Sequence, residues 1–395
     1  MKQIVQKFNN YIKKTIFKVQ NKTNNNFKIS NFNKFITIFI ALLFFYLFYL
    51  SIPVLYDKTW VQNNIEKWLL KEFKLDFSIS SDVSYRILPS PHFLIKDSKL
   101  FKKDDDKANT LADIKNLKVF IGQGSFFDKE KIILKHVKID TANFSISQRD
   151  LKLLAKKSKN NLSSKKIKIN DGNIFFKDHL DETVTIIKIK KALLFADNEN
   201  LLNIFNLKGE VFNVPFVFDY KKEFDSLNKY KFNFTTDTLK FNIFDSYDKD
   251  DFKKRRNIAS FLNIKLDTNY KAENGITTFE AKDLIIKNMK VDYVGELSID
   301  PFDLILNIKI DNYRLLKMLN INSILNELIK TELFFNDNLS IHTSIVASSN
   351  LKREIFQKAI INLNIIKGKI NFNKKKLFNK KIGSLELNNG NIYFK

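Results

Sequence analysis

VKIDTANFSI, residues 137–146, and IKINDGNIFF, residues 167–176, share the pattern that decides the fold. In each stretch apolar side chains alternate with polar ones, a small residue interrupts the middle, and the alternation then resumes. Period-two alternation is typical of a β-strand that buries one face. The pattern recurs in LIIKNMKVDY (284–293), LNIIKGKINF (363–372) and LELNNGNIYF (385–394). The uneven spacing of the copies predicts a recurring strand design rather than a regular solenoid repeat.

The phase of alternation changes once in every copy, and two structures could produce the change. Asp171-Gly172 and Asn389-Gly390 would suit a two-residue hairpin, whose type I′ turn needs positive φ. Ala142 and Met289 occupy the same slot, however, and tolerate positive φ poorly. We therefore favour one long strand with a bulge, which returns the apolar side chains to a single face.

Two further stretches, VFNVPFVFDY (211–220) and LILNIKID (304–311), alternate without interruption. Both predict strands of an antiparallel sheet that is covered on one side, so the predicted fold class is mainly β, an elongated, curved antiparallel sheet with a few short helices. Their apolar faces supply the candidates for the lining of a groove: Phe212, Val214, Phe216, Phe218, Tyr220, Leu304, Leu306, Ile308 and Ile310.

Residues 35–56 contain no charged side chain and are long enough to cross a hydrocarbon core roughly 30 Å thick. A signal peptide is the competing interpretation, but its apolar region would be shorter. The first 34 residues hold eight lysines and no acidic residue. The positive-inside bias then predicts a cytoplasmic basic segment (1–34), a transmembrane anchor (35–56) and, in a bacterium, a periplasmic body (57–395) on a single-pass inner-membrane tether.

The predicted body begins with a helix. In DKTWVQNNIEKWLLKEF, residues 57–73, apolar side chains recur at helical spacing. Further helices are expected in SQRDLKLLAKK (147–157) and from Asn312 to Leu333, and a charged surface loop is expected from Asp245 to Asn257. No Pro/Gly-rich linker divides residues 57–395, which favours one elongated unit.

LPSP, residues 88–91, places two prolines between two predicted strands. Proline fixes φ, lacks an N–H and holds the preceding residue extended, so a strand cannot continue its hydrogen-bond ladder through the pair. We expect Pro89 and Pro91 to form a structural turn that ends one strand and directs the next. An ordinary polar loop is the alternative.

Composition argues against several classes of function. The net charge of +24 comes from 61 lysines and only 6 arginines beside abundant Asn, Ile and Phe, which is the residue set of A/T-rich codons. We therefore expect no nucleic-acid partner. The absence of cysteine excludes disulfides and thiolate chemistry. His92, His136, His179 and His342 lie in unrelated contexts, and none has the spacing of a zinc site. The sequence also contains no Walker A, GxSxG or Gly-rich dinucleotide motif, so we expect no enzyme, cofactor or metal.

A single N-terminal span, the WVQNNIEKWL helix, strands hinged by LPSP, and then IKDSKL and HVKIDTANFSI together resemble the start of AsmA-like proteins. LKGEVFNVPFVFDY (207–220) is similar to a later strand pair of that family. Glycines usual in the family between the helix and the first strands are replaced here by Phe73, Lys74, Leu75 and Ser81. The resemblance implies a strongly curved sheet folded into an open, trough-like or taco-like shape that stands off the inner membrane.

The resemblance also implies a role in lipid transfer between membranes and in outer-membrane biogenesis, with phospholipid or another acyl-chain lipid as partner. A second protein in the periplasm or outer membrane is a further candidate partner. A sealed core between sheet faces would give the same periodicity as an open groove. A structural tether or scaffold, which binds a partner through a strand edge such as GNIYFK (390–395), is the alternative function.

Overall fold

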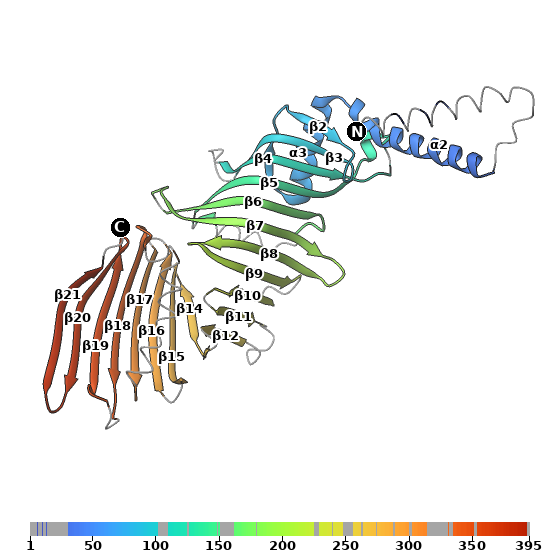
Figure 1. Cartoon of the computed structure of the whole chain (residues 1–395). Coiled ribbons are helices and arrows are strands. Elements are labelled where there is room, and N and C mark those ends of the chain that lie inside the picture. The colour runs from blue at the N-terminus through green and yellow to red at the C-terminus, as the bar shows by residue number, and fades with distance from the viewer. Residues whose placement is uncertain are drawn as a thin grey trace, which may run out of the picture. The chain divides into compact units, whose positions relative to one another are not determined.

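The computed structural model describes residues 31–101, 110–124, 126–147, 149–150, 162–178, 180–224, 229–238, 240–247, 256–261, 264–273, 275–286, 289–299, 302–313, 335–350 and 354–392, with residues 6, 10, 13 and 331 besides (Figure 1). The chain forms two compact units, Met1–Leu55 and Tyr56–Lys395. Most of the predicted basic segment and of the two later predicted helices lies outside the described residues.

The first unit contains the apolar helix α2 (Asn31–Ser51), which a short 3₁₀ helix, η1 (Ile52–Leu55), continues. Together they form the single helix, among the described residues, that is long and apolar enough to cross a membrane. Its apolar side chains are largely exposed, as Phe39 is at 57%. Such a surface suits a lipid environment.

The second unit begins with α3 (Lys58–Phe73), which confirms the predicted amphipathic helix. The Asp57 side chain caps its first turn by accepting a hydrogen bond from the Trp60 N–H at 2.8 Å. Lys74 ends the helix in the left-handed conformation at φ 54°. The apolar face of α3 is buried at Val61, Ile65 and Leu69.

The first sheet runs in chain order along β1 and β3 to β13, and β2 pairs with β3. Its strands are β1 (Asp76–Ser78), β2 (Val83–Arg86), β3 (His92–Phe101), β4 (Thr110–Ile121), β5 (Leu134–Ser147), β6 (Lys166–Lys177), β7 (Thr183–Asp197), β8 (Leu202–Val211), β9 (Val214–Glu223), β10 (Tyr230–Thr236), β11 (Phe241–Tyr247), β12 (Arg256–Phe261) and β13 (Ile264–Leu266).

The second sheet has the order β14 to β21. Its strands are β14 (Asn269–Glu273), β15 (Ile276–Ile286), β16 (Met289–Ile299), β17 (Phe302–Asp311), β18 (Leu339–Ser348), β19 (Lys358–Ile366), β20 (Lys369–Asn379) and β21 (Gly383–Ile392). The ends of the predicted surface loop 245–257 belong to β11 and β12, which pair through Asp245 and Asn257, so only its middle falls outside a described strand.

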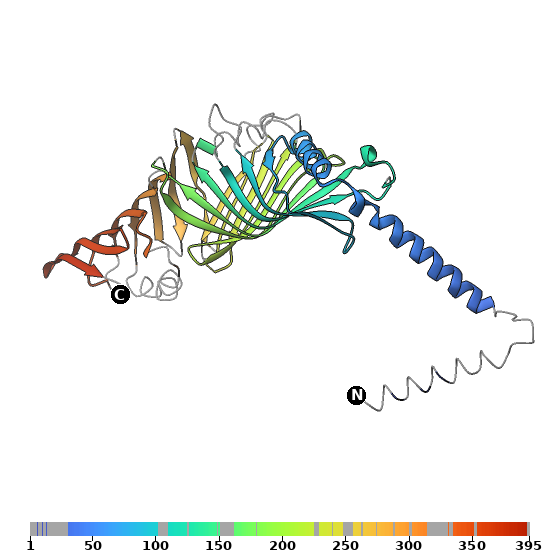
Figure 2. The same cartoon turned by 90° about the horizontal axis from the view of Figure 1, so that it is seen from above.

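The fold is mainly β, as predicted, but the expected purely antiparallel sheet is wrong. Strand β5 pairs in parallel with β6, with Val137 opposite Ile167, and β17 pairs in parallel with β18. The expected trough is replaced by solenoid-like stacks in which strands follow one another in chain order. Figure 2 shows the twist and curvature of the first stack. A parallel pair needs a crossover longer than a hairpin turn, which the intervals 148–165 and 312–338 provide.

The repeated pattern has two structural outcomes. Strands β5 and β6 each contain a whole copy, and Thr141 and Asp171 adopt positive φ where the alternation changes phase, at 60° and 52°. The apolar side chains then return to one face, but β5 and β6 keep an unshifted register with β4 and β7 at these residues, so the change of phase comes from the positive φ and not from the favoured bulge. The copies at 284–293 and 363–372 are instead divided between neighbouring strands, so the single-strand interpretation is wrong there.

The two prolines lie in the turn between β2 and β3. These strands pair antiparallel, with Arg86 opposite His92, so the turn ends one strand and directs the next back along it. The Leu88–Pro89 peptide bond is cis. The Pro91 carbonyl accepts a hydrogen bond from the Ile121 N–H at 3.1 Å, which ties the turn to the end of β4.

Candidate apolar groove

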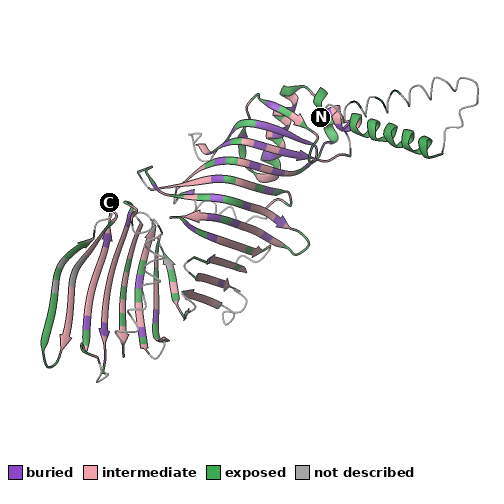
Figure 3. Cartoon of the chain, viewed as in Figure 1, coloured by how far each residue is buried: buried purple, intermediate pink, exposed green. Residues whose placement is uncertain are grey.

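Strand registers place apolar side chains from β3 to β13 on one face of the first sheet. One row begins with Ile95 opposite Leu117 and ends with Ala259 opposite Leu266. Between them the row passes through Ile139, Ile169, Ala192, Leu207, Phe218, Phe234 and Ile243. Burial is greatest at the β3–β5 end and decreases toward β12, as Figure 3 shows.

An apolar groove of about 820 Å³ lies on this face. Its floor comes from β5 to β9, and the end of α3 with the segment before β6 supplies further walls. The side chains that line it include Leu70, Phe73, Val137, Ile139, Phe144, Ile146, Leu162, Ile167, Ile169, Ala192, Leu194, Phe205 and Tyr220. Ligand pockets in proteins commonly measure about 300–1,000 Å³ and are mostly apolar.

A few polar side chains accompany this lining, and several bind one another. The Ser163 hydroxyl donates to the Glu72 carboxylate at 2.9 Å, which joins the segment before β6 to α3. The Leu162 N–H donates to Asn203 Oδ1 at 2.9 Å, so that buried amide oxygen is satisfied. Lys74, Lys165 and Lys222 also line the groove. These ammonium groups could pair with an anionic head group while the apolar floor holds a chain.

The predicted lining residues of the first stretch are distributed over one turn and one strand. Phe212 lies in the β8–β9 turn, where it and Asn213 have φ of 50° and 58°, a two-residue turn of the type I′ kind. Val214 and Phe216 are buried, and Phe218 and Tyr220 are half-buried on the same face. Of the nine predicted lining residues, Tyr220 is the one that lines the groove in the described part of the chain.

The predicted lining residues of the second stretch, Leu304, Leu306, Ile308 and Ile310, share one face of β17 and are half-buried. Ile308 lines a smaller pocket of about 350 Å³ together with Tyr293, Val294 and Val346. The second sheet therefore has an apolar face of its own, separate from the groove of the first sheet.

Sequence reasoning missed most of the groove. The alternation in the repeat copies predicts that β5 and β6 are strands with one apolar face, but the predicted lining omits four of their side chains, Val137, Ile139, Ile167 and Ile169. Their alternation was the available signal. The contribution of Leu70 and Phe73 from α3 depends on tertiary packing and has no local signal.

A polar group interrupts the apolar face near its far end. Asp245 of β11 is fully buried, and its Oδ2 accepts hydrogen bonds from the hydroxyls of Tyr230, at 3.0 Å, and of Tyr270 in β14. Burial raises the pKa of the Tyr230 phenol well above its usual value, and neighbouring Tyr270 and Asp245 add to the effect. The Tyr230 phenol therefore remains a donor, and the hydrogen bond from Tyr270 of β14 to Asp245 of β11 links the two sheets.

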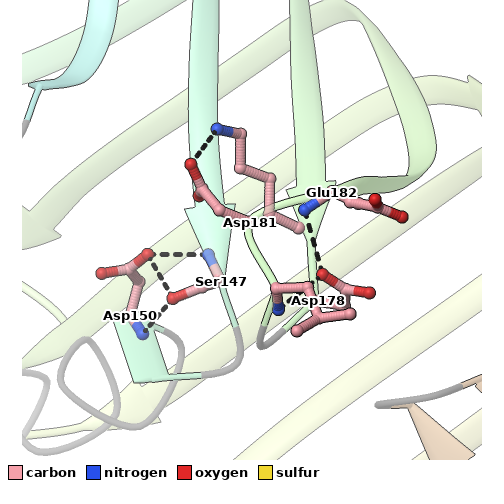
Figure 4. Close-up of polar contacts among 7 residues, drawn as sticks. Ser147, Asp150, Asp178, Asp181 and Glu182 are labelled. Carbon is pink, nitrogen blue, oxygen red and sulfur yellow. Dashed lines mark hydrogen bonds and ion pairs between the residues drawn. The ribbon is translucent and has the colours of Figure 1, made fainter.

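Other polar clusters have structural explanations. Figure 4 shows Asp150 accepting hydrogen bonds from the Ser147 N–H and hydroxyl, at 2.7 and 2.8 Å, at the end of β5. Asp178 accepts from the Glu182 N–H at 3.0 Å in the β6–β7 turn, where Asp181 pairs with Lys177. The acidic pair Asp181-Glu182 thus belongs to an exposed turn. The described residues contain no group of metal-ligating side chains.

Comparison with known proteins identifies no family. No family model and no curated protein matches the chain. Among solved structures, the sex pheromone staph-cAM373 precursor is 11% identical over 69% of this chain and 74% of its own, with a TM-score of 0.14. A sex pheromone precursor from Lactobacillus salivarius subsp. salivarius UCC118 is also 11% identical, over 72% of this chain and 70% of its own, with a TM-score of 0.13. Similarity at this level carries no argument about fold or function.

Proposed function

We propose that this chain is a single-pass protein of the bacterial inner membrane whose periplasmic body binds an acyl-chain lipid in its apolar groove. In this proposal it aids lipid transfer between membranes and outer-membrane assembly, as the resemblance to AsmA-like proteins implies. The observation that carries the proposal is the groove of about 820 Å³ with a mostly apolar lining.

The physical argument concerns the cost of exposing an acyl chain to water. Each CH₂ contributes about 0.8 kcal/mol, so a 16-carbon chain needs on the order of 13 kcal/mol to cross water unaided. An apolar groove lowers this barrier by replacing water with side chains. No chemical step is required.

The apolar row beyond the groove supports movement as well as binding. Phe205 contacts Phe218, which contacts Phe232, with ring centroids 5.9 and 6.3 Å apart. Tyr220, which lines the groove, stacks on Tyr230 at 6.4 Å. Half-buried aromatic rings therefore continue the apolar face from β8 to β10, and a chain leaving the groove meets apolar surface rather than water.

The orientation in this proposal rests on the ends of the apolar helix. All eight charged residues among the first 34 positions are lysines, the last of them in the first turn of the helix, whereas every acidic residue of the chain follows the helix. By the positive-inside bias the short basic end remains in the cytoplasm and the body lies in the periplasm.

Native mass spectrometry of the full-length chain, purified in a detergent that is then exchanged for amphipol, tests lipid binding. Wild type should carry co-purified phospholipid. Tyr220→Glu should remove most of it, because a carboxylate at this position disfavours contact with an acyl chain. Val217→Glu is the matched control, because Val217 is also half-buried in β9. It lies three residues before Tyr220, and side chains alternate along a strand, so it is on the opposite face.

Circular dichroism must show equal strand content in both variants. Equal lipid loss in Tyr220→Glu and Val217→Glu, or no lipid on the wild-type chain, would contradict the proposal.

A structural tether or scaffold is the second candidate, and one observation favours it. Strand β21 pairs with β20 along one edge, and its described side chains are exposed. An available strand edge can recruit a strand of a partner protein. Under this function, Tyr220→Glu would leave activity in cells unchanged, whereas prolines in β21 would abolish it.

A further inference from the structure

The connection between β4 and β5 contacts Tyr56, the first residue of the second unit, and presents large apolar side chains to solvent. Phe127 is 80% exposed and Ile133 is 64% exposed. The neighbouring β2–β3 turn presents Leu88, which is 79% exposed. Large apolar side chains grouped at one edge of a molecule commonly mark a contact surface.

Hydrogen bonds and one buried side chain hold the described residues of this connection. The Gly122 N–H donates to the Ile133 carbonyl at 2.8 Å and closes its base. Phe126 is fully buried beneath it, and η2 (Lys129–Lys131) follows, capped by the Asp128 side chain. Because Phe126 points inward and anchors the turn, its neighbour Phe127 is held outward.

The residues that immediately follow the apolar helix hold the connection in place. Tyr56, the first residue beyond Leu55, donates its hydroxyl to the Phe126 carbonyl at 2.5 Å. The Lys129 ammonium lies 5.2 Å from the centre of the Trp60 ring, which in turn contacts Tyr56. The loop that carries Phe127 is therefore bound directly to the first turn of chain outside the apolar span.

Because the loop is attached to the residues that follow the span, the bilayer is the partner that its exposed apolar side chains can reach. Headgroup layers extend about 5–8 Å beyond each side of the hydrocarbon core, so a side chain one residue past the span lies within this layer. Aromatic residues and lysines are enriched at that depth. Asp128 pairs with Lys131 at 2.8 Å and Glu130 lies between the lysines, so apolar insertion rather than net charge would dominate the contact.

We propose that Phe127, Ile133 and Leu88 form a second membrane contact, whose apolar side chains pass through the headgroup layer and reach the top of the acyl chains in the leaflet from which the body emerges. The contact seats the first strands of the sheet on the bilayer surface. It rests on the anchor in the proposed function and is independent of lipid transfer.

Site-specific labelling of the full-length chain tests this contact. The chain contains no cysteine, so Phe127→Cys, Ile133→Cys and Ile382→Cys each provide one site for the environment-sensitive fluorophore NBD. Ile382 lies in the β20–β21 turn and is 82% exposed, which makes it the matched exposed control. Phe39→Cys in α2 reports on the anchor. The proteins are reconstituted in vesicles of phosphatidylcholine and phosphatidylglycerol.

We expect the labels at 127 and 133 to show blue-shifted emission and several-fold stronger quenching than the label at 382 by lipids spin-labelled near the top of the acyl chain. Labels at 127 and 133 that behave like the label at 382, while the label at 39 is buried, would overturn the contact and leave the anchor intact. An unburied label at 39 would instead contradict the anchor in the proposed function.

A second quencher distinguishes a loop that lies close to the membrane from a loop that is inserted in it. A loop that merely lies close to the membrane would be quenched by a spin label on the headgroup but not by one on the acyl chain, and this outcome also overturns the proposal. Leu88→Ser combined with Phe127→Ser should reduce acyl-chain quenching of the label at 133 several-fold. Circular dichroism checks that this double variant retains its strands.

Discussion

The two sheets have the same alternating pattern but differ in how far their apolar faces are buried. In the first sheet Ile95 and Leu117 are fully buried, and the end of α3 helps to enclose a groove. In the second sheet Leu304 and Leu306 also share one face, yet both stay half-buried. Alternation determines which side chains share a face, whereas helices and loops that cover the face determine its burial.

Replacing one apolar-face leucine in each sheet by alanine should give the largest difference in stability between the two sheets. Leu117 is fully buried between Ile95 and Ile139, so Leu117→Ala should lower the free energy of unfolding by about 2–5 kcal/mol. Leu306→Ala at a half-buried position should cost about 1 kcal/mol. Guanidinium titrations of the detergent-solubilised chain, followed by circular dichroism, measure both. Equal losses would mean that the two faces are equally covered.

Glycines beneath aromatic rings offer a sharper comparison. A Cβ added at Gly209 would lie 2.5 Å from the Lys188 carbonyl oxygen, a backbone atom that cannot move freely, and 3.1 Å from Phe216 Cζ. At Gly295 it would meet the ring of Phe279, a half-buried side chain that can rotate away. Gly209→Ala should therefore destabilise the chain by about 1–3 kcal/mol.

Gly295→Ala should cost less than about 1 kcal/mol, because moving a half-buried ring to another rotamer is inexpensive. Thermal unfolding of the two variants under identical conditions gives the difference. A larger effect at Gly295 would show that the second sheet is packed more rigidly than its exposure indicates.

The hydrogen bonds of Asp245 connect the sheets and can be tested separately. Tyr270→Phe removes the donor from β14 and should weaken the link by about 1 kcal/mol. Tyr230→Phe, the matched control, removes the donor that lies in the same sheet as Asp245. Hydrogen exchange should become faster in β14 and β15 with Tyr270→Phe but not with Tyr230→Phe. The reverse pattern would contradict a linking role.

Much of the strand content was accessible from sequence, because alternation follows from the geometry of a strand with one covered face. Turn type was less accessible. Thr141 accepts positive φ inside β5, whereas Lys367 and Gly368 use positive φ to close a hairpin between β19 and β20. The same local pattern thus gives a continuous strand in one place and a hairpin in the other. Which of them forms depends on the neighbouring strands with which the segment pairs, and that is a property of the whole sheet.

The groove shows the same limit. Tyr220 was predicted from alternation and lines it, but Leu70 and Phe73 lie about 150 positions earlier and reach it only through the packing of α3. Parallel pairing of β5 with β6 likewise depends on the path of the connecting segment. Sequence periodicity identified apolar faces correctly and could not specify which elements would enclose them.

The smallest expected effect is a dependence of stability on pH in the first sheet. Phe120 lies between His92 and His136, with ring centroids 4.8 and 4.2 Å away. Burial lowers the pKa of His92, and nearby Lys118 and Arg86 lower it further, while a hydrogen bond with the Ser90 carbonyl opposes them.

Burial also lowers the pKa of His136, and nearby Lys168, Lys135 and Lys166 add to the effect. In the folded chain the pKa values of both histidines therefore lie below the ordinary value of about 6.5. At pH values between the lowered pKa and the ordinary one, the unfolded chain binds more protons than the folded chain. Stability should fall as the pH decreases from about 7 toward 5.

His136→Phe keeps a ring on Phe120 but cannot be protonated, so unfolding midpoints of this variant should depend less on pH than those of wild type. The measurement is made above pH 5, because the Asp140 carboxyl titrates at lower pH and so does not contribute to the change in stability. Partial burial opposes ionisation of Asp140, but hydrogen bonds from Lys118 and Lys138 outweigh that effect and hold its pKa below the usual value. A pH dependence in this window that His136→Phe leaves unchanged would therefore assign the protons to groups other than His136.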